Sequence, residues 1–196
     1  WLIMASAIDA MAHAIEAYVS VLSSPFTEMN SLKAIELIML HLEDAVRTKS
    51  MQSLTMLSTA STAAGMAFSN ASLGADHAIA HSLGGKYDVM HGLVHPVLLP
   101  AVMRFNLPAC PEKMALIGEI VTGRKERSHE DTALRGIQVL EDFFLSLNIP
   151  TRLSKLIPDP NSLREVSELA VQDACCLTNP RPLTWQDFLA MCEEVW

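Results

Sequence analysis

The chain has 196 residues, half of them hydrophobic, which is enough to bury a core and favours one domain or at most a small second lobe. Its formal charge of -8 and the lack of a basic run argue against DNA or RNA binding, because phosphates would find no positive surface. The four cysteines form no CxxC pair and no disulfide framework, so we expect free thiols and a reducing, cytoplasmic compartment.

The N-terminal segment is apolar and helical, and it carries two candidate metal ligands. In MASAIDAMAHAIEAYVS, Asp9 and His13 stand four residues apart, a spacing that puts both side chains on one face of a helix. Glu16 is either a second carboxylate that orients His13 or an ordinary solvated or helix-paired residue. Asp9 and Glu16 interrupt the apolar run, so it does not have the form of a signal peptide. Because the sequence opens at Trp1 inside this helix, we expect the chain to be cut from a longer protein.

The next segments have helical periodicity. Residues 50–75 include no charged side chain and are long enough to cross a bilayer. Their hydroxyls and small side chains instead favour a helix at the centre of a soluble bundle, where hydroxyls bond back to the helix backbone. We therefore expect no membrane partner. An apolar stripe before this segment consists of Leu32, Ile35, Met39, Leu42 and Val46.

A second segment rich in histidine follows in DHAIAHSLGGKYDVMHG. His77 and His81 have the same four-residue spacing, so spacing alone does not say which of them binds an ion. We expect Gly84 and Gly85 to end this helix and to turn the chain, so that His91 returns to the same metal. A carboxylate with several imidazoles suits zinc, iron, nickel or manganese better than calcium or magnesium.

The C-terminal part of the chain is also helical. No segment shows sustained strand alternation bounded by hairpin turns. The sequence therefore predicts an all-α bundle of about seven to nine helices. A second apolar stripe consists of Leu134, Ile137, Leu140, Phe144 and Leu147, and capping-box spacings pair Ser128 with Asp131, Ser162 with Glu165 and Thr184 with Asp187.

No nucleotide-binding motif accompanies these helices. GxGxxG does not occur, and Gly84-Gly85-Lys86 lacks the upstream glycine and the following Ser or Thr of a phosphate loop. We therefore expect residues 1–196 to form one helical, metal-binding catalytic domain without a nucleotide-binding domain of its own.

Three motifs in this order resemble the C-terminal metal-binding domain of the iron-dependent (group III) alcohol dehydrogenases. They are MASAIDAMAHAIEAYVS, SNASLGADHAIAHSLGGKYDVMHGLVHPVLLPAVMRFN and CCLTNPRPLTWQDF. The resemblance implies that His81 lies near the nicotinamide and substrate. The sequence departs from the family pattern at Met90, where Pro is frequent, and at His95, where many relatives have Asn. The metal ligands implied by the resemblance are Asp9, His13, His77 and His91.

The resemblance implies an NAD- or NADP-dependent enzyme that interconverts a small alcohol and an aldehyde or ketone and acts as a homo-oligomer such as a dimer. The divalent metal is iron by resemblance, with zinc or nickel as alternatives, and it acts as a Lewis acid while His81 relays a proton. A fragment without the nucleotide-binding domain is expected to be inactive alone.

Two other classes of function remain open from the residues. A metal-dependent hydrolase of the HD type would need a His-Asp dipeptide, whereas the order here is Asp76-His77. The other alternative is a non-catalytic helical domain used for association or metal binding.

Overall fold

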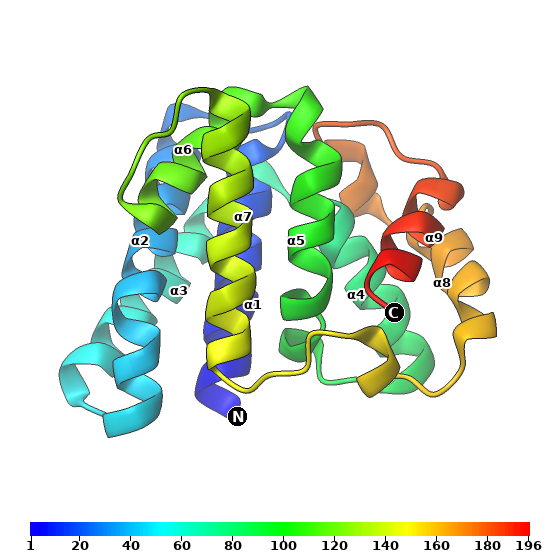
Figure 1. Cartoon of the computed structure of the whole chain (residues 1–196), viewed down its shortest axis with the longest axis horizontal. Coiled ribbons are helices and arrows are strands. Elements are labelled where there is room, and N and C mark those ends of the chain that lie inside the picture. Colours follow the sequence, from blue (N-terminus) through cyan, green and yellow to red (C-terminus); the bar gives the residue numbers. More distant parts are fainter.

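The computed structural model describes all residues from 1 to 196 and contains nine α-helices and no strand (Figure 1). The all-α prediction and the expected number of helices are therefore confirmed. The helices are α1 (Leu2–Val19), α2 (Pro25–Thr48), α3 (Met51–Ala71), α4 (Ala75–Tyr87), α5 (His95–Asn106), α6 (Pro111–Thr122), α7 (His129–Ser146), α8 (Leu163–Ala170) and α9 (Trp185–Glu194).

The hydrophobic core is divided into two clusters that meet along α5. One cluster joins α1, α2, α3, α6 and α7, and the other joins α4, α8 and α9. Helix α5 contributes Leu99 and Met103 to the first cluster and Leu98 and Val102 to the second. Figure 1 shows α5 standing between the two groups of helices. Residues near α5 can therefore bring side chains from both halves together.

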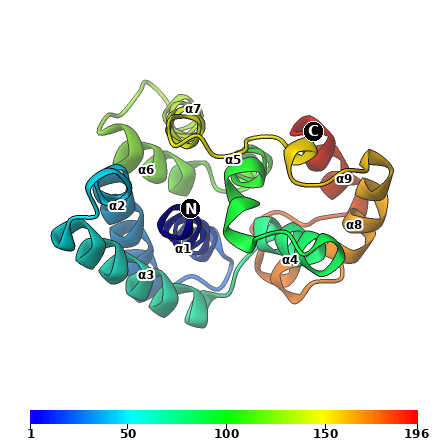
Figure 2. The same ribbon diagram turned by 90° about the horizontal axis from the view of Figure 1, so that it is seen from below.

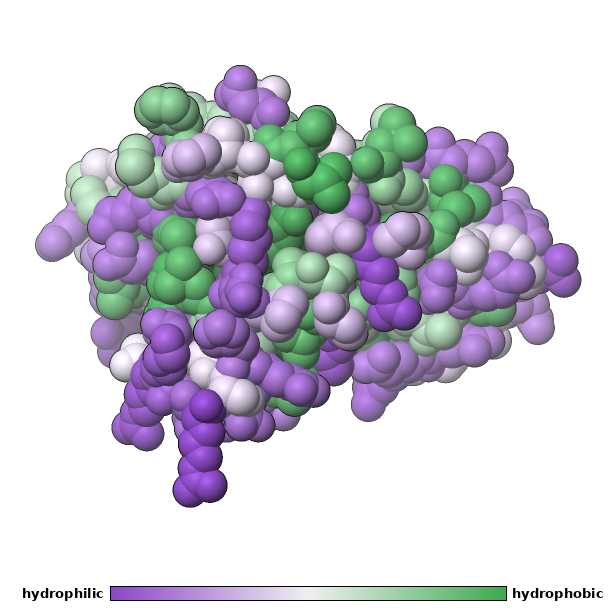
Figure 3. Space-filling model, turned by 90° about the horizontal axis from the view of Figure 1, so that it is seen from above, coloured by the Kyte–Doolittle hydropathy of each residue, from purple (hydrophilic) through white to green (hydrophobic).

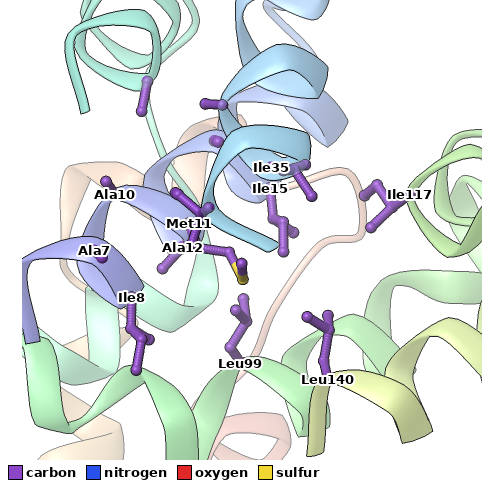
Figure 4. Close-up of a cluster of buried hydrophobic side chains, with 14 of the residues drawn as sticks. Ala7, Ile8, Ala10, Met11, Ala12, Ile15, Ile35, Leu99, Ile117 and Leu140 are labelled. Atoms are coloured by element: carbon purple, nitrogen blue, oxygen red, sulfur yellow. The ribbon is translucent and has the colours of Figure 1, made fainter. Parts of the chain in front are cut away.

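Helix α1 is the central helix of the larger cluster. Figure 2 shows it end-on, enclosed by α2, α3, α5 and α6. In Figure 4, Leu99 and Leu140 reach from α5 and α7 toward Met11 and Ile15 of α1, and all four side chains are buried. By length and hydropathy α1 could span a membrane, but 72% of it is buried inside the fold, as expected for a core helix.

Helix α3 lies at the edge of the bundle, so the prediction that residues 50–75 occupy its centre is wrong. Only one stripe of the helix is buried, and it faces α1 and α2 through small side chains such as Ala60 and Ala64. The hydroxyls of Thr55, Thr59 and Thr62 on the other side are exposed and donate to backbone oxygens four residues earlier, at 2.7 to 2.9 Å. These backbone bonds were predicted, and they explain how an uncharged helix tolerates solvent.

One of the three predicted capping boxes forms completely, at Thr184 and Asp187, whereas Ser128 caps its helix with the hydroxyl alone, because the Asp131 carboxylate accepts from that hydroxyl and not from the Ser128 N–H. The hydroxyls of Ser128 and Thr184 accept the backbone N–H of the residue three positions later, at the starts of α7 and α9. Ser162 does precede α8, but its hydroxyl donates to the Asp159 carbonyl oxygen at 2.6 Å. A 3₁₀ turn over residues 160–162 holds Ser162 in a helical conformation, so its side chain points backwards instead of capping α8.

Helix α4 does not end at its two glycines, contrary to the sequence prediction. Gly84 and Gly85 lie inside the helix, which continues to Tyr87. Asp88 then takes the left-handed conformation with φ 54°, and its N–H donates to the Gly84 carbonyl oxygen. An aspartate can adopt this conformation, so it supplies the C-cap that was expected from glycine.

Some hydrophobic side chains remain on the surface. Phe26, Met51 and Leu177 are among the most exposed. Figure 3 shows one face of the molecule, on which hydrophobic side chains lie interspersed with hydrophilic ones. Scattered exposure of this kind is ordinary for a folded domain.

Candidate metal centre

Candidate metal ligands from both halves of the molecule meet beside α5. Helix α1 carries Asp9 and His13, and α4 carries His77. His91 opens a 3₁₀ turn at His91–Leu93, and His95 is the first residue of α5. The chain between α4 and α5 does return to α4, as predicted, so that segments far apart in sequence become neighbours.

One carboxylate oxygen, Asp9 Oδ1, lies at the centre of this group. It is 3.4 Å from His13 Nδ1 and 3.6 Å from the Nε2 atoms of both His77 and His91. His95 Nε2 is nearer still, at 3.1 Å. Asp9, His77 and His91, three of the four residues expected from sequence, therefore come together with His95, at which the sequence only departs from the family pattern. His13 lies beside Asp9 but is not among the donors that are all close to one another. The four-residue spacing between His91 and His95 is the sequence feature that could have indicated that both side chains face the same site.

The chemistry of these atoms fits a divalent cation. Asp9 Oδ1, His77 Nε2 and His95 Nε2 are buried and have no hydrogen-bond partner. Leaving such atoms unpaired is costly, and a cation among them would satisfy all three. The donor atoms of Asp9, His77, His91 and His95 lie within 4.8 Å of one another. Donors at about 2.0–2.2 Å from one ion are at most about 4.4 Å apart, so only small adjustments are needed.

Glu16 holds His77 from the side away from Asp9. His77 Nδ1 donates to Glu16 Oε2 at 2.6 Å, and Glu16 Oε1 accepts the Asp76 N–H at 2.7 Å. Glu16 is almost fully buried. It therefore orients His77 and not His13, and it is not the solvated residue that the sequence left open. A carboxylate behind an imidazole fixes the tautomer whose Nε2 lone pair is free for a metal.

The same carboxylate belongs to a polar cluster at the start of α4. Asn179 Oδ1 accepts the Ala75 N–H at 3.2 Å, beside the bond from Asp76 to Glu16. A Cβ at Gly74 would approach Asn179 Oδ1 to 2.8 Å and Glu16 Oε1 to 2.9 Å. Glycine is therefore required for both side chains to reach the free N–H groups of the first turn.

His81 lies beside the cluster but not in it. Its ring stacks on His91 with centroids 5.5 Å apart, and its side chain is 45% exposed. His81 Nδ1 donates to Asp173 Oδ2 at 2.8 Å, and Asp173 Oδ1 accepts the Cys175 N–H. The structure thus distinguishes the two histidines of α4, since His77 faces Asp9 and His81 faces the exposed rim.

His13 closes the cluster on the side of α3. Its ring stacks on Phe68 with centroids 4.3 Å apart and lies 4.3 Å from the ring of His77. A separate hollow of about 360 Å³ lies between α1 and α3, and none of the candidate ligands lines it. This hollow is therefore not part of the candidate metal centre.

The electrostatics of the cluster favour a bound cation. Burial lowers the pKa of His13 and of His91 to about 4, with help from charged histidine neighbours, so both keep a free lone pair at neutral pH. Burial also opposes the charged form of His77, but Asp9 and Glu16 outweigh it and raise its pKa to about 10. The pKa of Asp9 is far below its usual range, because His77 and His95 outweigh the effect of burial. A cation would replace the proton on His77, so its binding should release a proton.

Comparison with known proteins identifies the family to which the chain is similar. The family profile described as "Fe-containing alcohol dehydrogenase family, C-terminal" matches residues 3–196. The chain is 39% identical to 1,3-propanediol dehydrogenase of Klebsiella pneumoniae over 98% of its length and 50% of that protein. It is 34% identical to the NAD-dependent methanol dehydrogenase of Bacillus methanolicus, over 95% of this chain and 49% of that one.

A solved structure gives the same match in three dimensions. The crystal structure of a 1,3-propanediol oxidoreductase superimposes with a TM-score of 0.94 at 38% identity, over 98% of this chain and 51% of that one. The chain thus spans about half the length of the relatives that it matches.

Proposed function

The chain belongs to the iron-containing alcohol dehydrogenase family, and we propose that it is the metal-binding catalytic half of an NAD- or NADP-dependent enzyme that interconverts a small alcohol and an aldehyde or ketone. The observation that carries this proposal is the convergence of imidazole nitrogens from three segments on the buried oxygen of Asp9. Residues 1–196 act as one helical domain in this proposal.

Asp9, His13, His77 and His91 are the proposed ligands of one divalent metal ion. Iron is favoured by the family, and zinc or nickel fits the same donors. The bound ion supplies a Lewis acid that polarises the alcohol or carbonyl oxygen. Asp9 contributes the negative charge, and Glu16 keeps the His77 ring in place through its 2.6 Å hydrogen bond.

His81 is the proposed proton relay. Because its Nδ1 donates to Asp173, its Nε2 is the atom left to exchange a proton with the substrate hydroxyl. Its exposure on the rim, next to His91, connects that atom with solvent. In this role His81 lies close to the nicotinamide and the substrate.

The nicotinamide cofactor would come with a nucleotide-binding domain, for which this sequence has no motif. We propose that the chain alone therefore has negligible alcohol dehydrogenase activity. We further propose a cytoplasmic homo-oligomer such as a dimer, with no nucleic-acid or membrane partner. The negative net charge and the four free cysteines support this part of the proposal.

Metal analysis of the purified chain tests the site. Under reducing conditions the parent should bind about one Zn²⁺ or Fe²⁺ ion, His77→Ala should lose most of the affinity, and His81→Ala should retain it. A parent without a tight site contradicts the proposal. Loss of metal in His81→Ala with full loading of His77→Ala would exchange the two roles.

Activity assays test the chemistry. Joined to a nucleotide-binding half, the chain should oxidise alcohols with NAD or NADP, and His81→Ala should lower turnover and alter its pH profile without loss of metal. Phosphoester hydrolysis in place of alcohol oxidation would identify a hydrolase instead. Metal binding with neither activity would support a domain that serves only association or metal binding.

A further inference from the structure

His95 occupies a place that the proposed ligand set leaves unexplained. It is completely buried at the start of α5, where the two halves of the core meet. Its Nε2 lies 3.1 Å from Asp9 Oδ1, the shortest of the four imidazole distances to that oxygen. A polar atom this deeply buried requires a partner, because its desolvation is otherwise uncompensated.

A hydrogen bond to Asp9 does not supply that partner. Despite the 3.1 Å distance between them, His95 Nε2 and Asp9 Oδ1 are both buried without a hydrogen-bond partner. The two atoms lie side by side and both face the space that they share with His77 Nε2 and His91 Nε2. This is the arrangement of donors around an ion.

Asp76 orients His95 toward that space. His95 Nδ1 donates to Asp76 Oδ2 at 2.6 Å, and both side chains are fully buried. Glu16 and His77 form the same kind of pair, also at 2.6 Å. Two buried carboxylates thus fix two imidazoles by Nδ1 and turn both Nε2 atoms toward Asp9. Metal-binding histidines are commonly held in this way by a carboxylate behind the ring.

We propose that His95 Nε2 is a direct ligand of the divalent ion and that Asp76 is its positioning residue. The ion is then held by one carboxylate and four imidazoles, Asp9 with His13, His77, His91 and His95. This inference rests on the proposed function of the cluster as a metal centre. It enlarges the ligand set with the most buried histidine of the chain.

The substitution His95→Asn isolates the proposed bond. An asparagine amide N–H can take the place of Nδ1–H toward Asp76, but asparagine has no atom at the position of Nε2. With Co²⁺ as the probe and a competing chelator, this variant should bind at least about 100-fold more weakly than the parent, which is the upper end of the effect of losing a residue that only orients a ligand. Asp76→Asn, which disturbs only the orienting residue, should weaken binding by about 10-fold. His41 lies on α2 and belongs to none of the candidate metal groups, so His41→Asn is the matched control and should bind Co²⁺ as tightly as the parent.

The visible spectrum of the Co²⁺-loaded chain is an independent readout. Removing a ligand changes the coordination number, so the d–d bands of His95→Asn should differ in intensity from those of the parent and of His41→Asn. Far-UV circular dichroism shows whether the variant is folded. If His95→Asn does not fold, the nitrogen resonances of the ¹⁵N-histidine-labelled parent show whether His95 binds the ion. Zn²⁺ should shift the Nε2 resonance of His95 together with that of His77.

The outcomes separate this inference from the proposed function. If the parent binds Co²⁺ and His77→Ala abolishes binding, while His95→Asn keeps the affinity and the spectrum of the parent, His95 is not a ligand and the metal centre stands without it. An unshifted His95 Nε2 in the Zn²⁺-loaded parent leads to the same conclusion. If the parent binds neither ion, the proposed metal centre fails, and the inference fails with it.

Discussion

Replacing Glu16 with glutamine should weaken metal binding without changing any proposed ligand. Glutamine has the same shape, and its oxygen can still accept the Asp76 N–H that Glu16 Oε1 accepts at 2.7 Å. Its amide group then faces His77 Nδ1, which lies 2.6 Å from Glu16 Oε2. Because that amide donates, His77 Nδ1 must accept, and the ring proton moves to Nε2. The atom that should bind the ion is then blocked.

The size of the effect follows from these contacts. Loss of an orienting carboxylate lowers metal affinity by about 10- to 100-fold, or about 1.4–2.7 kcal/mol. The metal-free fold should also lose stability, because a buried hydrogen bond to a charged group contributes about 1.5–3 kcal/mol. Glutamine keeps one of the two contacts of Glu16, so the variant is expected to fold.

Chelator competition with Zn²⁺ measures the affinity, and urea unfolding of the metal-free chain measures the stability. Glu36→Gln is the matched control, since Glu36 forms an exposed ion pair with Lys33 on α2 and should change either quantity very little. A folded Glu16→Gln protein that binds Zn²⁺ as tightly as the parent would refute the reasoning, because the tautomer of His77 would then not depend on Glu16.

Three further predictions concern other parts of the molecule. Gly118→Ala should lower the stability of the fold by about 1–3 kcal/mol, because its Cβ would lie 2.3 Å from the Thr132 carbonyl oxygen. A Cβ at Gly65 in α3 meets no atom within 4 Å, so Gly65→Ala should stabilise the fold by up to about 1 kcal/mol, and thermal unfolding measures both variants. Lys113 lowers the pKa of Glu28, so this contact stabilises the fold above about pH 4.5 and is lost as the pH falls through the lower folded-state pKa; in urea titrations Glu28→Gln should reduce the loss of stability in acid. Burial raises the pKa of every cysteine thiol, so alkylation at pH 8 should be slow in the folded chain and fast in urea, as mass spectrometry can show.

The sequence by itself determined the features that depend on near neighbours. The helical period and the absence of strand patterns predicted an all-α bundle, and the cap residues Ser128 and Thr184 marked two helix starts correctly. The four-residue spacing of Asp9 and His13 predicted that both side chains face one point, and they do. These features follow from backbone geometry and hydrogen bonds within one or two turns, which a short stretch of sequence specifies.

Tertiary structure decided which side chains meet across the fold. Glu16 lies 61 positions from His77, and Asp76 lies 19 positions from His95, so no local spacing reveals either pair. The same applies to the choice between His77 and His81, because one helix presents both on the same face and only the packing of α1 beside α4 turns one toward Asp9. Contacts of this kind depend on how whole helices pack into a shared core, and that arrangement is set by many buried side chains together.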